Sequence, residues 1–64
     1  MTNFEAVLIK RDGLSYSEAK ACREEAKNTI YQMFEEGASD FLIEDYLMSE
    51  FGLELDYIMD ILDF

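Results

Sequence analysis

Apolar residues recur along the chain at intervals of three and four, the spacing that places side chains on one face of a helix. The first such segment covers about residues 3 to 12, with Phe4, Val7 and Leu8 on one face. Its apolar run Ala6–Ile9 would also suit a strand, but the sequence holds no second clear strand to pair with it. We therefore predict a helix for this segment.

A second predicted helix of about 20 residues begins after Leu14. Ser15 and Glu18 have the S-x-x-E spacing of a capping box, in which each side chain accepts a hydrogen bond from a backbone N–H at the helix start. Leu14 can form the outer half of a hydrophobic staple. The apolar stripe of this helix consists of Ala19, Cys22, Ala26, Ile30, Met33 and Phe34.

The side chains of that stripe become larger along the predicted helix. Its first three members are small side chains, which let another helix approach closely, and its last three are bulky. We expect the first helix to pack against the small end. Two later helices are expected to pack against the bulky end.

Two shorter helices are predicted in the second half of the chain. Ser39 is expected to cap a helix over about residues 40 to 51, and a short helix over about residues 55 to 62 follows. Their inward positions are Ile43, Tyr46, Leu47 and Phe51 in the third helix and Ile58, Ile61 and Leu62 in the fourth.

Glycines separate the four segments. Gly13, Gly37 and Gly52 each follow a periodic stretch, where a helix end favours a residue that tolerates the left-handed conformation. A chain of 64 residues is long enough for one small domain, over residues 1–64. The pattern predicts an all-α domain, a small bundle of three to four helices with the long second helix as its platform.

The last 25 residues resemble a helix-turn-helix unit. The positions that carry the resemblance are Leu47 and Phe51 in the first helix, Gly52 in the turn, Leu53 after it, and Ile58 and Ile61 in the second helix. The resemblance implies a helical hairpin, with glycine at a turn position of positive φ and apolar residues buried between the two helices.

The hairpin departs from that family at two places. Met48 lies one turn before Gly52, where the family has a small residue, and a methionine there should open the angle between the helices. The second helix carries Asp56, Asp60 and Asp63 opposite its apolar side. Because DNA binding rests on Lys and Arg that neutralise phosphates, a helix with three carboxylates would repel a duplex. We expect packing geometry from the resemblance, without direct contact with nucleic acid.

The chain as a whole resembles the small acidic helical proteins encoded by phages and mobile elements. The resemblance lies in its Glu-rich helices and in the ending GLELDYI at residues 52 to 58. Many such proteins act on host factors, so the resemblance implies a partner that is a host protein.

The net charge of −10 lies entirely in the second part of the sequence. Residues 1–27 hold equal numbers of acidic and basic side chains, whereas residues 28–64 hold ten Asp and Glu and no Lys, Arg or His. Spread along a compact helical pair of about 20 to 25 Å, ten carboxylates give about one charge per 2 to 2.5 Å. Duplex DNA carries one per roughly 1.7 Å.

This charge distribution suggests an acidic protein-binding module, and possible mimicry of DNA toward a basic nucleic-acid-binding host protein. Such a partner would be attracted at long range, at a rate that falls as salt rises. The expected partner-binding residues are Glu44, Asp45, Glu50, Glu54, Asp56, Asp60 and Asp63.

Two other interpretations remain open at this point. The acidic residues could serve solubility alone. Alternatively, the chain could be a homodimerising interaction protein, because half of its residues are apolar and so small a core cannot hide all of them. Met48, Met59, Tyr57, Tyr31 and Phe64 would supply the exposed surplus, with Met59 and Phe64 in a dimer interface. Repulsion between two acidic chains would oppose that dimer at low salt.

Chemistry on substrates is not expected from this sequence. It contains no His, and Cys22 has no base to activate it, so neither an enzyme nor a zinc site is predicted. Glu44 with Asp45, or Glu35 with Glu36, could hold a hard cation, but no calcium-loop motif surrounds them. The isolated glycines form no phosphate-binding loop. We predict no metal and no cofactor.

The sequence also bears on the compartment. A lone cysteine forms no internal disulfide, which is typical of a reducing compartment. The first ten residues lack the charged start and long apolar run of a secretory signal. No apolar stretch approaches the roughly 20 residues of a membrane span. We expect a soluble cytoplasmic protein that has no membrane partner.

Overall fold

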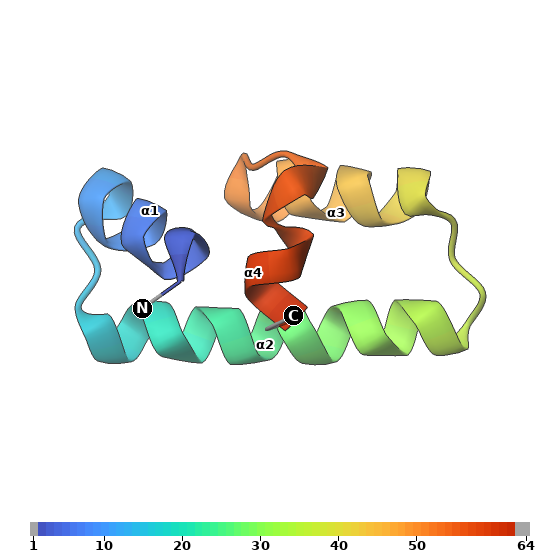
Figure 1. Cartoon of the computed structure of the whole chain (residues 1–64), viewed down its shortest axis with the longest axis horizontal. Helices are drawn as coiled ribbons and strands as arrows, with labels where there is room; N and C mark the ends of the chain where they lie inside the picture. The colour runs from blue at the N-terminus through green and yellow to red at the C-terminus, as the bar shows by residue number, and fades with distance from the viewer. Residues whose placement is uncertain (1, 63–64) are drawn as a thin grey trace.

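The computed structural model describes residues 2–62 and confirms the all-α prediction. The described residues form four α-helices, one 3-10 turn and no strand. In Figure 1 the long helix α2 forms the base, and the other helices lie on one side of it. The elements are α1 (Asn3–Asp12), α2 (Tyr16–Glu35), α3 (Asp40–Phe51), η1 (Leu55–Tyr57) and α4 (Ile58–Leu62).

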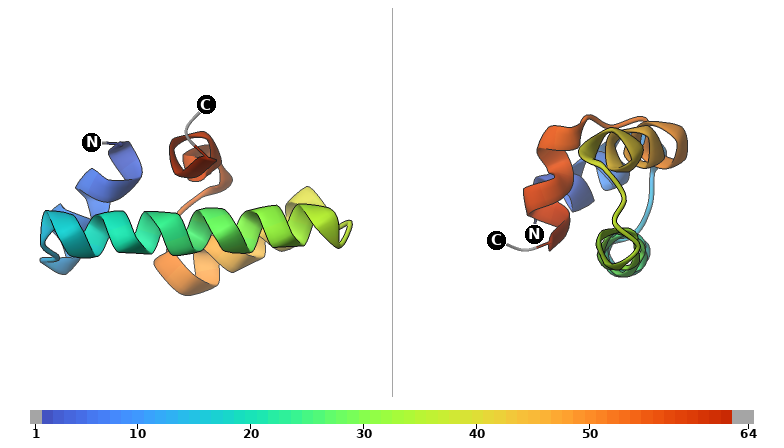
Figure 2. Two further views of the ribbon diagram at one scale, coloured as in Figure 1. Left: turned by 90° about the horizontal axis from the view of Figure 1, so that it is seen from below. Right: turned by 90° about the vertical axis from the view of Figure 1, so that its right-hand side faces the viewer.

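Along α2, α1 lies over the first half, α4 lies across the middle and α3 lies above the second half (Figure 1). Seen end-on in Figure 2, α2, α3 and α4 form the corners of a triangle. The expected packing of α1 against the small end of the α2 stripe is confirmed. The expectation that both later helices pack against the bulky end is wrong for α4, which packs across the middle of α2, while α3 lies above the second half of α2.

Capping boxes fix the starts of α1 and α2. The predicted box at Ser15 and Glu18 is confirmed: the Ser15 N–H donates to Glu18 Oε1 at 2.9 Å, and the Glu18 N–H donates to Ser15 Oγ at 3.1 Å. Thr2 and Glu5 form an equivalent box, with the Thr2 N–H 3.0 Å from Glu5 Oε1. This box has the T-x-x-E spacing of a capping box in the sequence, at residues 2 to 5.

Ser39 is the N-cap residue of α3, as predicted, but the side-chain hydrogen bond expected of a capping serine does not form. The Leu42 N–H, which a capping hydroxyl would engage, donates instead to the Ser39 carbonyl at 3.0 Å. Asp40 remains in the first turn, where the helix dipole favours an anion.

The core draws residues from all four helices. Its buried members are Phe4, Leu8, Ala19, Ala26, Ile30, Ile43, Leu47, Leu53, Ile61 and Leu62. The predicted stripes of α1 and α3 are therefore confirmed at their central positions. The Phe4 and Phe51 rings meet edge to face with their centroids 5.1 Å apart, which joins the start of α1 to the end of α3.

Phe34 was predicted to face inward, but 44% of its surface is exposed. It lies in the last turn of α2, and the first buried residue of α3 is Ile43, one turn into that helix. The apolar periodicity of α2 continues to its last turn, but the last fully buried residue of the helix is Ile30, with Met33 partly buried after it.

Of the six positions that carried the helix-turn-helix resemblance, three are buried, Phe51 and Ile58 are partly buried, and Gly52 is exposed. Leu47, Leu53 and Ile61 belong to the core, and Gly52 adopts a left-handed φ of 65°. Met48 is 55% exposed and lies outside the core, beside Glu54, Leu55 and Asp56 of the returning segment.

A buried polar contact joins α1, α2 and α4. Arg23 Nη1 donates to the Ile61 carbonyl at 3.3 Å, and Arg23 Nε lies 3.6 Å from Glu5 Oε1. Glu5 is only 3% exposed, so the guanidinium compensates a carboxylate inside the fold. In the part of the chain that the structure describes, no helix is long and apolar enough to cross a membrane.

Candidate acidic interaction surface

Carboxylates from two elements gather around a shallow depression beside the α3 hairpin, which we call the outer hollow. It has a volume of about 390 Å³ and is lined by Glu44, Met48, Glu54, Leu55 and Asp56. The turn at Gly52 reverses the chain after α3, and this reversal brings the segment from Glu54 to Asp56 back beside Glu44. Its three carboxylates lie on exposed residues around a partly apolar floor.

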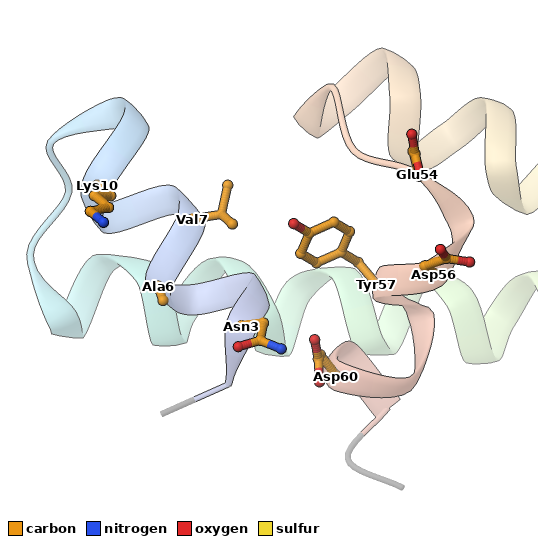
Figure 3. Close-up of a pocket in the computed structure, with 8 residues that line it drawn as sticks. All are labelled: Asn3, Ala6, Val7, Lys10, Glu54, Asp56, Tyr57 and Asp60. Carbon is orange, nitrogen blue, oxygen red and sulfur yellow. The ribbon is translucent and has the colours of Figure 1, made fainter.

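A second depression, the α1–α4 groove, lies between α1 and the η1–α4 segment (Figure 3). Its volume is about 500 Å³. The residues that line it are Asn3, Ala6, Val7 and Lys10 on α1, and Glu54, Asp56, Tyr57 and Asp60 on the opposite side. Because Glu54 and Asp56 line both depressions, the groove and the outer hollow form one continuous surface.

The side chains of the groove do not all point the same way. In Figure 3, Tyr57 and Asp60 project toward α1, Val7 projects toward Tyr57, and Asp56 points away from α1. Asp60 is half-buried at the groove wall, whereas Asp56 is exposed between the two depressions. A ligand in the groove would therefore meet Asp60 first, and one on the outer hollow would meet Asp56.

The seven predicted binding residues do not share one face. Glu44, Glu54, Asp56 and Asp60 come together around the two depressions. Asp45 projects about 100° away from Glu44 around α3, because an α-helix has 3.6 residues per turn. We expected one common acidic face, and the structure gathers four of the seven residues.

Glu50 does not join the four gathered carboxylates. Glu50 lies four residues after Tyr46 and therefore on the same side of α3. Burial raises the pKa of Tyr46, a hydrogen bond with Thr29 acts in the opposite direction, and the carboxylates of Glu25 and Glu50 add to the rise. Glu50 is therefore directed away from Asp45, which lies about 140° from it around the helix. Asp63 lies outside the described residues.

No base of the described residues neutralises the gathered carboxylates. The ion pairs within residues 2–62 are Arg11 with Asp12 at 2.9 Å, Arg23 with Glu5 at 3.6 Å, and Arg23 with Glu24 at 3.5 Å. All of these acids belong to the first half of the chain. Lys10 lines the groove but forms none of these pairs.

Sequence reasoning missed the contribution of α1 to this surface. Asn3, Ala6, Val7 and Lys10 follow a helical spacing of three, one and three, and form a stripe beside the buried one at Phe4 and Leu8. That spacing was visible in the sequence. Its role was not, because the element that faces it is more than forty residues away, at Glu54 to Asp60.

Several large apolar side chains are exposed, as expected for a chain so rich in them. Met48 and Met59, which we named as surplus, are 55% and 58% exposed. Phe41 was not named, although it is 76% exposed. Tyr31 is also exposed, but Tyr57 is partly buried against the core and so is not part of the exposed surplus. Phe64 lies outside the described residues.

No protein-family model matches this chain, and no curated protein or solved structure matches it.

Proposed function

We propose that this protein is an acidic protein-binding module that occupies the nucleic-acid-binding surface of a basic partner protein. The observation that supports the proposal is the gathering of Glu44, Glu54 and Asp56 around the outer hollow, with Asp60 in the adjoining groove. No Lys or Arg of the described residues forms an ion pair with them. These charges are therefore available to a basic partner.

The physical basis is electrostatic complementarity. Carboxylates held on folded elements keep a fixed spacing, as phosphates do on a duplex, and together they attract a basic groove from a distance. The same charges repel nucleic acid, so the expected partner is a protein. Under this proposal Asp45 and Glu50 add to the long-range attraction, while the four gathered carboxylates make the contacts.

Capture of partners at two salt concentrations tests the proposal. The immobilised protein is exposed to bacterial lysate at low and at high sodium chloride, and captured proteins are identified by mass spectrometry. We expect nucleic-acid-binding proteins that are retained at low salt and lost at high salt, because screening weakens exposed charge pairs. Added duplex DNA should displace them, since it would compete for the same basic groove.

Two triple variants with equal changes in charge locate the contact surface. The first variant is Glu44→Gln, Glu54→Gln and Asp56→Asn, which removes the charge of the outer hollow. The matched control is Glu25→Gln, Glu35→Gln and Glu36→Gln, on α2 and directly after it. We expect the first variant to lose the captured proteins and the control to retain them. Equal retention by both, or capture that does not respond to salt or DNA, contradicts the proposal.

A homodimerising interaction protein is the second candidate. The observation that favours it is the exposure of Phe41 and Met59, which lie outside the core. Sedimentation velocity at several protein concentrations separates the two functions. The first proposal expects a monomer, whereas the second expects a dimer that strengthens as salt screens the repulsion between acidic chains.

A further inference from the structure

The α1–α4 groove combines two kinds of surface that one charged ligand could use together. Ala6 and Val7 supply aliphatic surface from α1, and the half-buried ring of Tyr57 supplies aromatic surface from the opposite wall. Figure 3 shows Val7 and Tyr57 directed toward each other, with the Asp60 side chain on the Tyr57 side of the groove. The groove therefore suits a ligand that has an apolar stem and a cationic end.

The charges of the groove are unequal. Glu54, Asp56 and Asp60 line it together with one cation, Lys10. Among the described residues, Lys10 lies within ion-pair distance of none of these carboxylates. A cation that enters the groove would thus meet carboxylates that no base of residues 2–62 has neutralised.

We infer that the groove receives an arginine side chain of the basic partner, an inference that rests on the proposed function. The methylene stem of the arginine lies against Val7, and its guanidinium stacks on Tyr57 and donates to Asp60. Arginine suits these walls better than lysine, because its planar group stacks on aromatic faces, binds carboxylates through two parallel bonds and is more weakly hydrated than an ammonium.

A titration with a blocked amino acid tests this inference without knowledge of the partner. The ¹⁵N-labelled protein is titrated with N-acetyl-arginine methylamide at constant ionic strength, and backbone amide shifts are followed by NMR. Blocked citrulline has the same shape without the charge and serves as the ligand control. We expect saturable shifts centred on Val7, Tyr57 and Asp60, with arginine binding about fivefold more tightly than citrulline.

Charge-matched variants place the ligand within the groove. Asp60→Asn should weaken the binding of blocked arginine about three- to fivefold, whereas Asp45→Asn, outside the groove, should weaken it less than about twofold. Lys10→Gln should tighten binding about twofold by removing a repelling cation, and Lys20→Gln on the exposed face of α2 should not reproduce that effect.

The inference is overturned if no saturable shift appears in the groove, if shifts follow the α3 carboxylates instead, or if Asp60→Asn and Asp45→Asn weaken binding equally. If one of these results is obtained but a basic protein is still captured in a salt-sensitive way, the arginine site is rejected and the proposed function is retained. Binding of blocked arginine in the groove together with a failure of capture would reject the proposed function and keep the arginine site.

Discussion

Arg23 stands on α2, and its guanidinium group contacts two other helices, α1 and α4. Its Nη1 donates to the Ile61 carbonyl of α4, and its Nε lies 3.6 Å from Glu5 on α1 without a hydrogen-bond partner among the described residues. Glu5 already accepts bonds from the Thr2 N–H and hydroxyl at 3.0 and 2.9 Å. The Arg23–Glu5 contact is thus chiefly a compensation of buried charge, and the bond to Ile61 fixes α4.

Removing this side chain should destabilise the fold. We expect Arg23→Met to lower the free energy of unfolding by about 1 to 3 kcal/mol, because Glu5 and the Ile61 carbonyl lose a buried partner. Urea unfolding followed by circular dichroism measures the change. Lys20→Met, an exposed position on the same helix, should alter stability by less than about 0.5 kcal/mol. Equal losses in the two variants would contradict the role assigned to Arg23.

Glu5 should make stability depend on acid pH. The hydrogen bond from the Thr2 N–H lowers the pKa of Glu5, while burial acts in the opposite direction. Because this pKa is lower in the folded state, the charged form favours folding well above the ordinary Glu pKa of about 4.3. The contribution is lost as the pH falls through the lowered value.

Comparison with a Glu5→Gln variant isolates that contribution. Unfolding free energies measured from neutral pH down to about pH 3 should show the advantage of the natural protein shrinking as the pH falls. The pKa of Glu18 is also lowered, by the Ser15 N–H, but both proteins share this effect and it cancels. A constant difference across the range would mean that the Glu5 charge does not stabilise the fold.

At the scale of single elements, the starts of α2 and α3 differ although both have serine at the cap. The Ser15 hydroxyl accepts the Glu18 N–H, while the Ser39 hydroxyl accepts no bond from its helix. The Glu18 carboxylate also accepts a hydrogen bond from the Ser15 N–H, which the apolar side chain of Leu42 cannot do at the equivalent position of α3. A serine in the sequence therefore marks where each helix begins, but it does not show whether the serine side chain forms a hydrogen bond that stabilises the first turn.

Matched substitutions should expose this difference. Ser15→Ala should lower the free energy of unfolding by about 1 kcal/mol, the usual effect of losing a capping side chain. Ser39→Ala should have a clearly smaller effect, because no side-chain bond is lost. Thermal and urea unfolding of the two variants side by side give the comparison, and a larger loss from Ser39→Ala would contradict the geometry described for α3.

Local signals in the sequence sufficed to predict the elements. The capping box at Ser15 marks the start of α2, and Gly52 marks the end of α3, as predicted. Both signals were readable because capping and left-handed turns depend on residues close in sequence. Phe34 was misplaced because its exposure depends on what α3 places opposite it. Periodicity finds an apolar face, but it does not say how far a partner helix covers that face.

The candidate site was harder to predict for the same reason. Glu54, Asp56 and Asp60 could be named from charge alone. Their separation from Asp45 and Glu50 follows from rotation around α3 and from the hairpin, and the opposite wall at Val7 comes from the other end of the chain. The sequence shows that a surface formed by this half of the chain will be negatively charged. Tertiary packing decides which carboxylates lie on the same surface.

The molecule as a whole is an elongated body of 33 × 17 × 17 Å, whose length α2 sets with its 20 residues. The ion pairs among the described residues lie in the first half of the chain, and the uncompensated acids lie in the second. Like charges held close together repel one another, so the acidic surface costs stability.

Salt should therefore stabilise this protein. We expect its melting temperature to rise between about 50 and 500 mM sodium chloride, because the Debye length falls from above 10 Å to a few Å and screens the repulsion. The Glu44→Gln, Glu54→Gln and Asp56→Asn variant should melt higher at low salt and gain less from added salt. A variant with the same salt response as the natural protein would show that these carboxylates do not repel one another appreciably.

The bond from Arg23 to Ile61 links residues 38 positions apart and fixes a helix of five residues that carries Asp60 into the groove. The orientation of the Asp60 carboxylate thus depends on Arg23, whose guanidinium group does not line the groove. Random mutagenesis scored for lost recognition should recover interior positions such as Arg23 as well as surface ones. Thermal unfolding would distinguish the two groups, because variants at interior positions should have a lower melting temperature as well as weaker partner binding.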